Sequence, residues 1–479
     1  MRKPNIVLIL ADDMGYGDVG CFGATKIPTP NMDRLAAEGI RFTDCHSSSA
    51  VCTPSRYSIV TGRYCWRSSL KRLVLGGFGA PIIESGRPTA ASMLKDAGYA
   101  TAAIGKWHLG FDWTRRDGAG TLEDFGAPAW SLDGFDIDFS KPLEGGPTAL
   151  GFDYYFGISG SLDMPPYCFI ENDHTVGIPA REKDRYFHQQ RRGVMAPGWR
   201  DDEVDTAFAA KANQFIEAQT LASPDRPFFL YLATASPHRP CDVRPDFVVG
   251  KSQAGDRGDM VCLFDWVVGQ VAGTLKRLGI AQDTLLVVTS DNGARLTCAD
   301  GNDYGHKSCG DWRGQKADIW DGGHREPFIA RWPGHITPGA TCAQPVCLVD
   351  FMATCAEVVH ADLPEGAAED SIGFLPHLLG RKPEHPMRDT IVHHSGDGMF
   401  AIRRGGWKLI RGLGSGGFTE PRHMDPEPGG PEGQLYDMEA DFAETTNLWL
   451  DRPAIVRQLS AHLQDCIEAG RSRPQVSPL

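Results

Sequence analysis

Oxygen-bearing side chains end two apolar runs that lie far apart in the sequence. Asp12 and Asp13 follow the run Asn5–Ala11, and Asp291 and Asn292 follow a much later run. Taken singly, each pair is typical of a turn or a helix cap. If the two runs are neighbouring strands, the four side chains converge and need a counter-charge. A divalent cation such as Ca²⁺ or Mg²⁺ prefers such oxygen ligands, so the combination predicts a metal site.

A cysteine at the predicted start of a helix is the second candidate for chemistry. The segment Cys52-Thr53-Pro54-Ser55-Arg56 leads into a helical pattern, Ser55–Thr61. Pro54 suits a first helical turn, so Cys52 would lie at the positive end of the helix dipole. A thiol in that position could have a lowered pKa and act as a nucleophile. The alternative is a buried free cysteine, the interpretation that suits most of the other twelve.

Both the metal site and a role for Cys52 require a sheet whose strands end close together. Four nearly continuous apolar runs are typical of strands buried on both faces of a parallel sheet. They are Asn5–Ala11, Ala100–Ile104, Phe228–Thr234 and Thr284–Thr289. The helical patterns between them are Thr29–Glu38, Thr89–Ala97, Val204–Gln219 and Met260–Leu278. This alternation predicts βαβ units, in which ligands collect beyond the carboxyl ends of the strands.

Two further polar segments follow predicted strands, Lys106-Trp107-His108 and Ser236-Pro237-His238. Residues two apart after a strand can point the same way, so Lys106 and His108 would face one site while Trp107 packs on the other side. Two long irregular segments, Phe111–Leu150 and Asp163–Arg200, are candidates for pocket walls.

The pattern changes after about residue 380. Four short alternating runs predict a small antiparallel sheet, and Pro453–Ala469 has the periodicity of a closing helix. The runs are Thr390–His394, Met399–Arg403, Trp407–Arg411 and Gln434–Met438. We therefore expect an α/β fold. Residues 1–380 would form a large mixed, mostly parallel sheet flanked by helices, and residues 381–479 a smaller antiparallel sheet with a helix.

The composition is that of a globular protein and excludes several classes of function. Among 479 residues, 41% are hydrophobic, and 48 basic against 61 acidic side chains give a net charge of −13. Binding to nucleic-acid backbones needs clustered positive charge, so no nucleic-acid partner is expected. The longest early apolar run, Ile6–Ala11, is far shorter than the roughly 20 residues of a spanning helix, so no membrane segment is expected.

The number of cysteines and the N-terminal sequence indicate in which cellular compartment the protein is expected. Thirteen cysteines without a Cys-x-x-Cys pair fit neither a disulfide framework nor a zinc ribbon. Without a visible signal peptide the chain is expected in the cytoplasm, or in the periplasm or outside the cell if a longer precursor was trimmed.

The segment around Cys52 resembles the signature of type I sulfatases, in the alkaline-phosphatase-like superfamily. The matching residues are Cys52, Pro54-Ser55-Arg56 and Thr61-Gly62-Arg63. Other matching segments follow in family order: Pro4–Asp13, Pro30–Phe42, Gly105–Gly110, Ser236–His238, Ser290–Gly293, Gly314–Arg325 and Gln434–Leu448. The resemblance implies a fold like the one predicted above, and a Cys52 that a maturation enzyme oxidises to formylglycine.

The resemblance also implies a role for each matched side chain. The implied ligands of a calcium ion, or alternatively a magnesium ion, are Asp12, Asp13, modified Cys52, Asp291 and Asn292. Arg56 would hold the formylglycine. The side chains implied around the sulfate are Lys106, His108, His238 and Lys316. Such cationic groups would stabilise a sulfate ester in a protein of net negative charge.

The implied reaction begins with hydrated formylglycine at position 52, whose hydroxyl attacks sulfur. His238, assisted by Lys316, would protonate the departing alcohol. His108 would deprotonate the second hydroxyl, so that sulfate is released and the aldehyde returns.

The substrate is inferred from loops. Ser159–Asp173 and Gly314–Arg325 resemble segments of carbohydrate sulfatases that act on sulfated galactose or N-acetylgalactosamine. Ser161, His324 and Arg325 are the residues expected to bind such a glycan, and simple aryl sulfates are expected to react as well. Two alternatives remain open: a phosphonate or phosphate ester hydrolase of the same superfamily, and a catalytically silent protein that binds anions or glycans.

Overall fold

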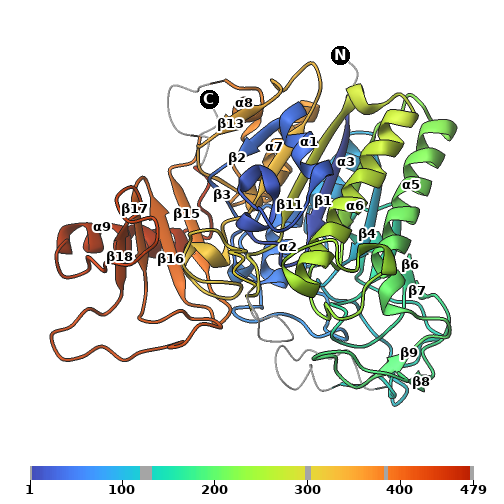
Figure 1. Cartoon of the computed structure of the whole chain (residues 1–479), viewed down its shortest axis with the longest axis horizontal. Helices are drawn as coiled ribbons and strands as arrows, with labels where there is room; N and C mark the ends of the chain where they lie inside the picture. Colours follow the sequence, from blue (N-terminus) through green and yellow to red (C-terminus); the bar gives the residue numbers. More distant parts are fainter. Residues whose placement is uncertain (1–2, 119–131, 297–303, 382–386, 475–479) are drawn as a thin grey trace.

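A computed structural model describes residues 3–118, 132–296, 304–381 and 387–474. Its centre is a ten-stranded sheet with the strand order β13-β2-β12-β11-β1-β10-β4-β5-β6-β7 (Figure 1). The strands are β1 (Asn5–Ala11), β2 (Ile40–Phe42), β4 (Ala100–Lys106), β5 (Tyr154–Ile158), β6 (Ile170–Glu171), β7 (His174–Thr175), β10 (Phe228–Ala233), β11 (Thr284–Ser290), β12 (Phe328–Arg331) and β13 (Ala340–Cys342). The central strands are parallel, whereas β12, β6 and β7 join their neighbours antiparallel.

Helices cover both faces of this sheet, and the alternation of side chains along β1 shows how. Ile6, Leu8 and Leu10 join one hydrophobic cluster, and Val7 and Ile9 join the other. The helices of the first cluster are α2 (Cys52–Thr61), α3 (Ala90–Asp96), α7 (Phe351–Val359) and the short α8 (Leu375–Leu378). Those of the second are α1 (Pro30–Glu38), α5 (Val204–Ala222) and α6 (Gly255–Arg277). Strands buried on both faces read as continuous apolar runs, which is why β1, β10 and β11 were visible in the sequence.

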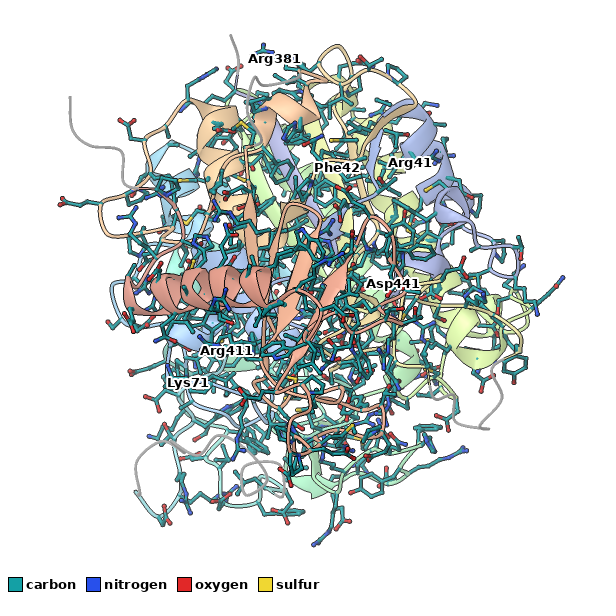
Figure 2. The ribbon with its side chains drawn as sticks, turned by 90° about the vertical axis from the view of Figure 1, so that its left-hand side faces the viewer. Arg41, Phe42, Lys71, Arg381, Arg411 and Asp441 are labelled. Carbon is teal, nitrogen blue, oxygen red and sulfur yellow. The ribbon has the colours of Figure 1, made fainter. Side chains whose placement is uncertain are left out.

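A smaller antiparallel sheet lies to one side of the large one, in red and orange (Figure 1). Its strands are, in order, β15 (Thr390–His394), β16 (Phe400–Arg404), β17 (Trp407–Ile410) and β18 (Gln434–Asp437). The closing helix α9 (Pro453–Glu468) packs on this sheet through Leu459, Leu463 and Cys466. Viewed from that side, the helix and the small sheet lie in front of the larger layer, with Arg411 beside them (Figure 2).

Two pairs of very short strands complete the described architecture: β3 (Cys45–His46) with β14 (Val346–Cys347), and β8 (Arg181–Glu182) with β9 (Val194–Met195). None of the helices in the described ranges is long and apolar enough to cross a membrane.

The predicted fold class is confirmed, and most of the predicted elements lie within a few residues of the observed ones. Two helix starts were placed too late: α2 begins at Cys52 rather than Ser55, and α6 at Gly255 rather than Met260. The sequence interpretation overlooked strands β2, β5 and β12 and helix α7. Twelve cysteines lie in the described ranges and all are free, nine of them buried; Cys298 falls outside those ranges.

Candidate active site

Four neighbouring parallel strands, β11, β1, β10 and β4, end at the same edge of the large sheet. The register pairs Ala11 of β1 with Ser290 of β11, and Ala233 of β10 with Gly105 of β4. The segments that follow these strands therefore meet: Asp12-Asp13, Asp291-Asn292, Ser236–His238 and Lys106–His108. Helix α2 reaches the same place, where Thr53 Oγ1 donates to the carbonyl oxygen of His108 at 3.0 Å.

Two buried lysines pair with the two aspartates that follow β1. Lys106 Nζ donates to Oδ2 of Asp12 at 2.7 Å, and Lys316 Nζ donates to Oδ2 of Asp13 at 2.8 Å. The amide of Asn292 donates to Oδ1 of Asp13, also at 2.8 Å. Buried charges are tolerated when they are paired in this way, and the site combines acidic ligands with cationic groups that can attract an anion.

Arg56 is completely buried one turn after Cys52 on α2. Its Nε donates to Oδ2 of Asp291 at 2.8 Å, and Nη1 donates to the carbonyl oxygen of Lys106 at 2.8 Å. Nη2 lies 3.7 Å from Oδ1 of Asp12. Arg56 thus positions Asp291 beside the acidic cluster, while its expected contact with a modified residue 52 stays a prediction.

The acidic cluster offers oxygen atoms that suit a cation. Oδ1 of Asp12 and Oδ1 of Asn292 are buried and accept no hydrogen bond within the described structure. Burial raises the pKa of Asp12 to about 7; Lys106 opposes this rise, and Asp291 adds to it. A buried oxygen without a donor is costly, and a divalent cation would satisfy both atoms. The residues present therefore fit a calcium or magnesium ion.

The geometry groups the possible ligands somewhat differently from the sequence prediction. Asp12, Asp13, Cys52 and His238 can each place one ligand atom within 4.8 Å of the others. His238 was not among the expected ligands. Asp291, which was, accepts hydrogen bonds at both oxygens, from Arg56 and from the backbone of Asp13.

Cys52 is the first residue of α2 and is 1% exposed. Nζ of Lys316 lies 3.3 Å from its Sγ. Burial raises the pKa of the Cys52 thiol to about 12, although Lys106 and Lys316 oppose the rise. An unmodified thiol in this place is protonated at neutral pH, so the structure does not support the alternative of a low-pKa thiolate nucleophile.

His108 follows β4 in the left-handed backbone region, with φ of 57°. Its Nε2 lies 2.9 Å from the carbonyl oxygen of Leu75, which can only accept, so Nε2 must carry the proton. Nδ1 is buried and has no partner among the described residues. Burial, with Lys106, holds the pKa of His108 well below its usual range. The ring is therefore neutral and presents an unpaired basic nitrogen.

His238 is a neutral imidazole of the opposite tautomer. Its Nδ1 lies 2.8 Å from the carbonyl oxygen of Arg239, so Nδ1 donates and Nε2 is free to act in the site. Nε2 lies 3.7 Å from Oδ2 of Asp13. Burial, followed by Lys316 and Lys106, holds the pKa of His238 well below its usual range. Before it can act as an acid, His238 must gain a proton at Nε2.

These groups open onto a cavity of about 320 Å³. Its walls include Cys52, His108, Ser161, His238 and Lys316. The hydroxyl of Ser161 is buried and has no hydrogen-bond partner in the described structure, which leaves it available to a ligand. The structure thus brings three of the four expected sulfate-binding groups, His108, His238 and Lys316, to one cavity. Lys106 does not line it and pairs with Asp12 instead, while Lys316 connects the cavity to the acidic cluster through Asp13.

The cavity walls come from several separate loops. The irregular segment Asp163–Arg200 contributes Asp163, Met164 and Arg191, as predicted for a pocket wall. No described residue of Phe111–Leu150 lines this cavity, and residues 119–131 of that segment lie outside the described ranges.

Four arginines in the cavity walls were not anticipated from the sequence: Arg191, Arg239, Arg295 and Arg422. Arg239 directly follows His238, so its position could have been noticed. Arg191 lies in the irregular segment predicted as a pocket wall, whereas Arg295 and Arg422 come from loops without a local pattern that marks them.

Two expected substrate-binding residues lie outside the wall of this cavity. His324 is 0% exposed and Arg325 4% exposed, and neither lines the cavity. Arg325 forms ion pairs at 2.8 Å with Asp44 and at 2.9 Å with Asp321. Nδ1 of His324 lies 3.0 Å from Nδ1 of His46. Both residues belong to an internal network, in which Lys408 and His393 of the C-terminal sheet contact His324 and two carboxylates hold Arg325.

That network includes three buried histidines, His46, His324 and His393, at the junction of the two sheets. The rings of His324 and His393 are stacked, with centroids 3.8 Å apart and planes 13° apart. Lone pairs of stacked rings run side by side rather than converge on one point, and Lys408 Nζ lies 3.2 Å from Nε2 of His324. This arrangement suits a structural contact better than a metal site.

Comparisons with known proteins agree with this geometry. The family model described as Sulfatase matches residues 4–361. The chain is 34% identical to an N-acetylgalactosamine-6-O-sulfatase of Bacteroides thetaiotaomicron, covering 97% of this chain and 93% of that protein. It is 32% identical to human steryl-sulfatase, covering 84% of this chain and 74% of that protein. A solved structure connected with the metabolism of multiple glycosaminoglycans by Bacteroides thetaiotaomicron aligns with a TM-score of 0.81 and 32% identity, covering 97% of this chain and 99% of that chain.

Proposed function

The chain belongs to the sulfatase family, and from this we propose that it hydrolyses the sulfate monoester of a sulfated carbohydrate of the galactose or N-acetylgalactosamine type. As a member of that family it is a sulfuric ester hydrolase. The glycan preference is supported by the N-acetylgalactosamine-6-O-sulfatase that covers nearly the whole chain. Aryl sulfates are expected to react as well.

The observation that carries the proposal is the position of Cys52 beside Lys316 in the cavity wall, 3.3 Å apart at Sγ and Nζ. A sulfate group that enters the cavity meets this ammonium group, and the Ser161 hydroxyl can donate to it. Fixed donors in a water-poor site stabilise developing negative charge strongly, since they need no reorganisation when the reaction occurs.

We assign the nucleophile to residue 52 after its oxidation to formylglycine by a maturation enzyme, which makes the hydrated side chain a source of an oxygen nucleophile. Arg56 and Lys106 keep the surrounding carboxylates in place. A calcium ion, with magnesium as the alternative, would be held by Asp12, Asp13, Asp291, Asn292 and residue 52. That ion would supply positive charge against the sulfuryl oxygens.

The two histidines have complementary tautomers that suit complementary roles. His108 presents an unpaired Nδ1, so it can remove a proton from residue 52 when sulfate is released. His238 presents Nε2, where it would deliver a proton to the departing alcohol. Burial and, after it, the neighbouring Lys316 lower the pKa of His238; the negative charge of a bound sulfate opposes the effect of Lys316, so substrate entry favours the protonated form.

The proposal is tested with protein from a host that has the maturation enzyme. Peptide mass analysis reports the state of residue 52, and sulfate release is measured on sulfated galactose and N-acetylgalactosamine saccharides, on nitrophenyl sulfate, and on matched phosphate and phosphonate esters. We expect formylglycine at position 52 and the fastest turnover on a sulfated saccharide. A strong preference for phosphorus esters would contradict the proposal, and unmodified Cys52 without turnover would favour a silent binding protein.

A further inference from the structure

Asp163 is a charged residue in the substrate cavity that the reaction described above does not use. It lies in the loop that follows β5, in a turn closed by the hydrogen bond from Met164 N to Ser161 O at 3.2 Å. The residue is 1% exposed and contributes to the cavity wall together with Ser161 and His238.

Two arginines hold one oxygen of this carboxylate. Oδ2 accepts from Nη1 of Arg191 at 3.2 Å, and from Nε and Nη2 of Arg239 at 3.0 and 2.8 Å. The other oxygen, Oδ1, is buried and has no hydrogen-bond partner in the described structure. Burial raises the pKa of Asp163, but the positive charges of Arg239 and Arg191 outweigh it and hold the pKa below its usual value. The side chain is therefore an anion with one unused acceptor.

An anionic carboxylate is unexpected in a cavity that must admit a sulfate. Its charge would repel the substrate unless it were neutralised, and the two arginines do this. The bare oxygen cannot bind the sulfate group, because ester sulfate oxygens and carboxylate oxygens only accept hydrogen bonds. A buried acceptor without a partner costs free energy, so Oδ1 is suited to a donor on the part of the substrate that carries the sulfate.

We propose that Asp163 is a specificity-determining residue, whose Oδ1 accepts a hydrogen bond from a hydroxyl or amide N–H group of the sugar that carries the sulfate. This rests on the proposed sulfatase function and narrows its substrate class. The site would select sulfate esters of polyhydroxylated alcohols over esters of alcohols that lack such a donor. Sites built to pair with a substrate hydroxyl reject analogues without it more strongly than apolar pockets do.

The substitution Asp163→Asn reverses the hydrogen-bonding polarity at this point and changes the volume little. Arg191 and Arg239 can only donate, so the amide oxygen must face them. The NH₂ group then takes the place of Oδ1, and a donor replaces the acceptor. The arginines keep an acceptor, which favours retention of the fold.

The matched control is Asp201→Asn. Asp201 is also buried and accepts from Lys183 and Gln190 at 2.8 Å each, so it anchors the irregular segment that carries Arg191. It does not line the cavity. A general loosening of this segment would affect both variants, whereas loss of a substrate contact would affect only Asp163→Asn.

The experiment measures kcat/KM of the wild type and both variants on N-acetylgalactosamine 6-sulfate and on nitrophenyl sulfate, which has no hydroxyl or amide N–H group. We expect Asp163→Asn to lose about 10- to 100-fold on the sugar sulfate and less than about threefold on the aryl sulfate. For Asp201→Asn, kcat/KM should fall only slightly, and by a similar factor on the sugar sulfate and on the aryl sulfate. An equal loss on the two substrates, with a shifted pH profile, would mean that Asp163 acts through His238 and would overturn the inference. Unchanged kinetics would overturn it as well.

Deoxy analogues of the sugar sulfate test the same contact from the substrate side. In the wild type, at least one deoxy analogue should react about tenfold or more slowly, and Asp163→Asn should show no further loss on that analogue. If Asp163→Asn fails to fold, the rates of the wild type on the deoxy analogues still test the contact. Equal rates on the sugar sulfate and on all its deoxy analogues would refute it. A wild type that hydrolyses no sulfate ester would instead refute the proposed function.

Discussion

Nζ of Lys316 bridges Sγ of Cys52, at 3.3 Å, and Oδ2 of Asp13, at 2.8 Å. One ammonium group thus links the start of α2 to the acidic residues that follow β1. Because burial keeps the Cys52 thiol protonated, this link cannot be explained as activation of a thiolate. It is consistent with a modified residue 52 that carries an oxygen nucleophile between a lysine and a cation.

Replacing the nucleophile gives the first prediction. Cys52→Ala should reduce sulfate ester turnover by more than about 1000-fold, because no oxygen nucleophile can form at position 52. The fold should persist, since removal of one buried sulfur typically costs about 1 kcal/mol. Turnover and thermal unfolding are measured together. Cys168→Ala, which removes another buried cysteine outside the cavity wall, should stay active. Retained turnover by Cys52→Ala would contradict the assignment of formylglycine at position 52 as the nucleophile.

Asp12, Asp291 and Lys106 could be proposed from the sequence because each follows an apolar run that is typical of a buried strand, whereas Arg56 and Lys316 were implied only by the family resemblance. Strands β1 and β11 gave clear apolar runs, and their polar ends at Asp12 and Asp291 pointed to one edge of the sheet. Strand β12 is only four residues long. It pairs with β2, which lies near the other end of the large sheet's sequence. Such pairing leaves no local pattern to recognise.

The positions of His324 and Arg325, away from the cavity, could not be predicted for a related reason. Their segment matches the family, but His324 is contacted by Lys408 and His393 of the distant C-terminal sheet, and Arg325 is paired with Asp44, which is also distant in sequence. Sequence periodicity reports which face of an element is buried, not which domain covers it. The pairing of Asp163 with Arg239 could not be predicted either, since it joins two loops across the cavity.

Cation binding should be linked to proton release. In the cation-free protein the pKa of Asp12 is raised to about 7, so this carboxyl takes up a proton as the pH falls through 7. A cation needs the ionised form, and its apparent affinity should fall by up to about tenfold per pH unit below 7. Calcium titration by calorimetry between pH 5.5 and 8, after removal of bound metal with a chelator, measures this. The chelated protein should be inactive and melt at lower temperature, and calcium should restore both. An affinity that does not change with pH would contradict the assignment.

Acid should destabilise the protein partly through His394. This buried histidine lies at the end of β15, and burial lowers its pKa to about 4. The unfolded histidine titrates near pH 6.5, so between pH 4 and 6.5 the unfolded state binds more protons, and the free energy of unfolding rises with pH across that window. His394→Leu should make this slope shallower by up to about 1.4 kcal/mol per pH unit and leave the slope above pH 7 unchanged. Denaturant titrations at several pH values provide the measurement; identical slopes would exclude the contribution.

The junction between the two sheets should depend on one buried lysine. Lys408 on β17 is 0% exposed, and its Nζ lies 2.8 Å from carboxylate oxygens of both Asp321 and Glu444. Lys408→Met would leave two buried carboxylates short of a counter-charge, and we expect a loss of about 3–5 kcal/mol in the free energy of unfolding.

The pH dependence of this loss distinguishes a missing charge from a packing defect. Burial raises the pKa of Glu444 to about 7, and Lys408 opposes that rise. Without the lysine, Glu444 should become neutral more readily, so the destabilisation by Lys408→Met should be larger at pH 8 than at pH 6. Lys307→Met, which breaks an exposed ion pair with Asp311, is the control and should change stability little. If Lys408→Met destabilised the protein equally at both pH values, the loss would come from changed packing or hydrogen bonding at the junction rather than from the missing charge.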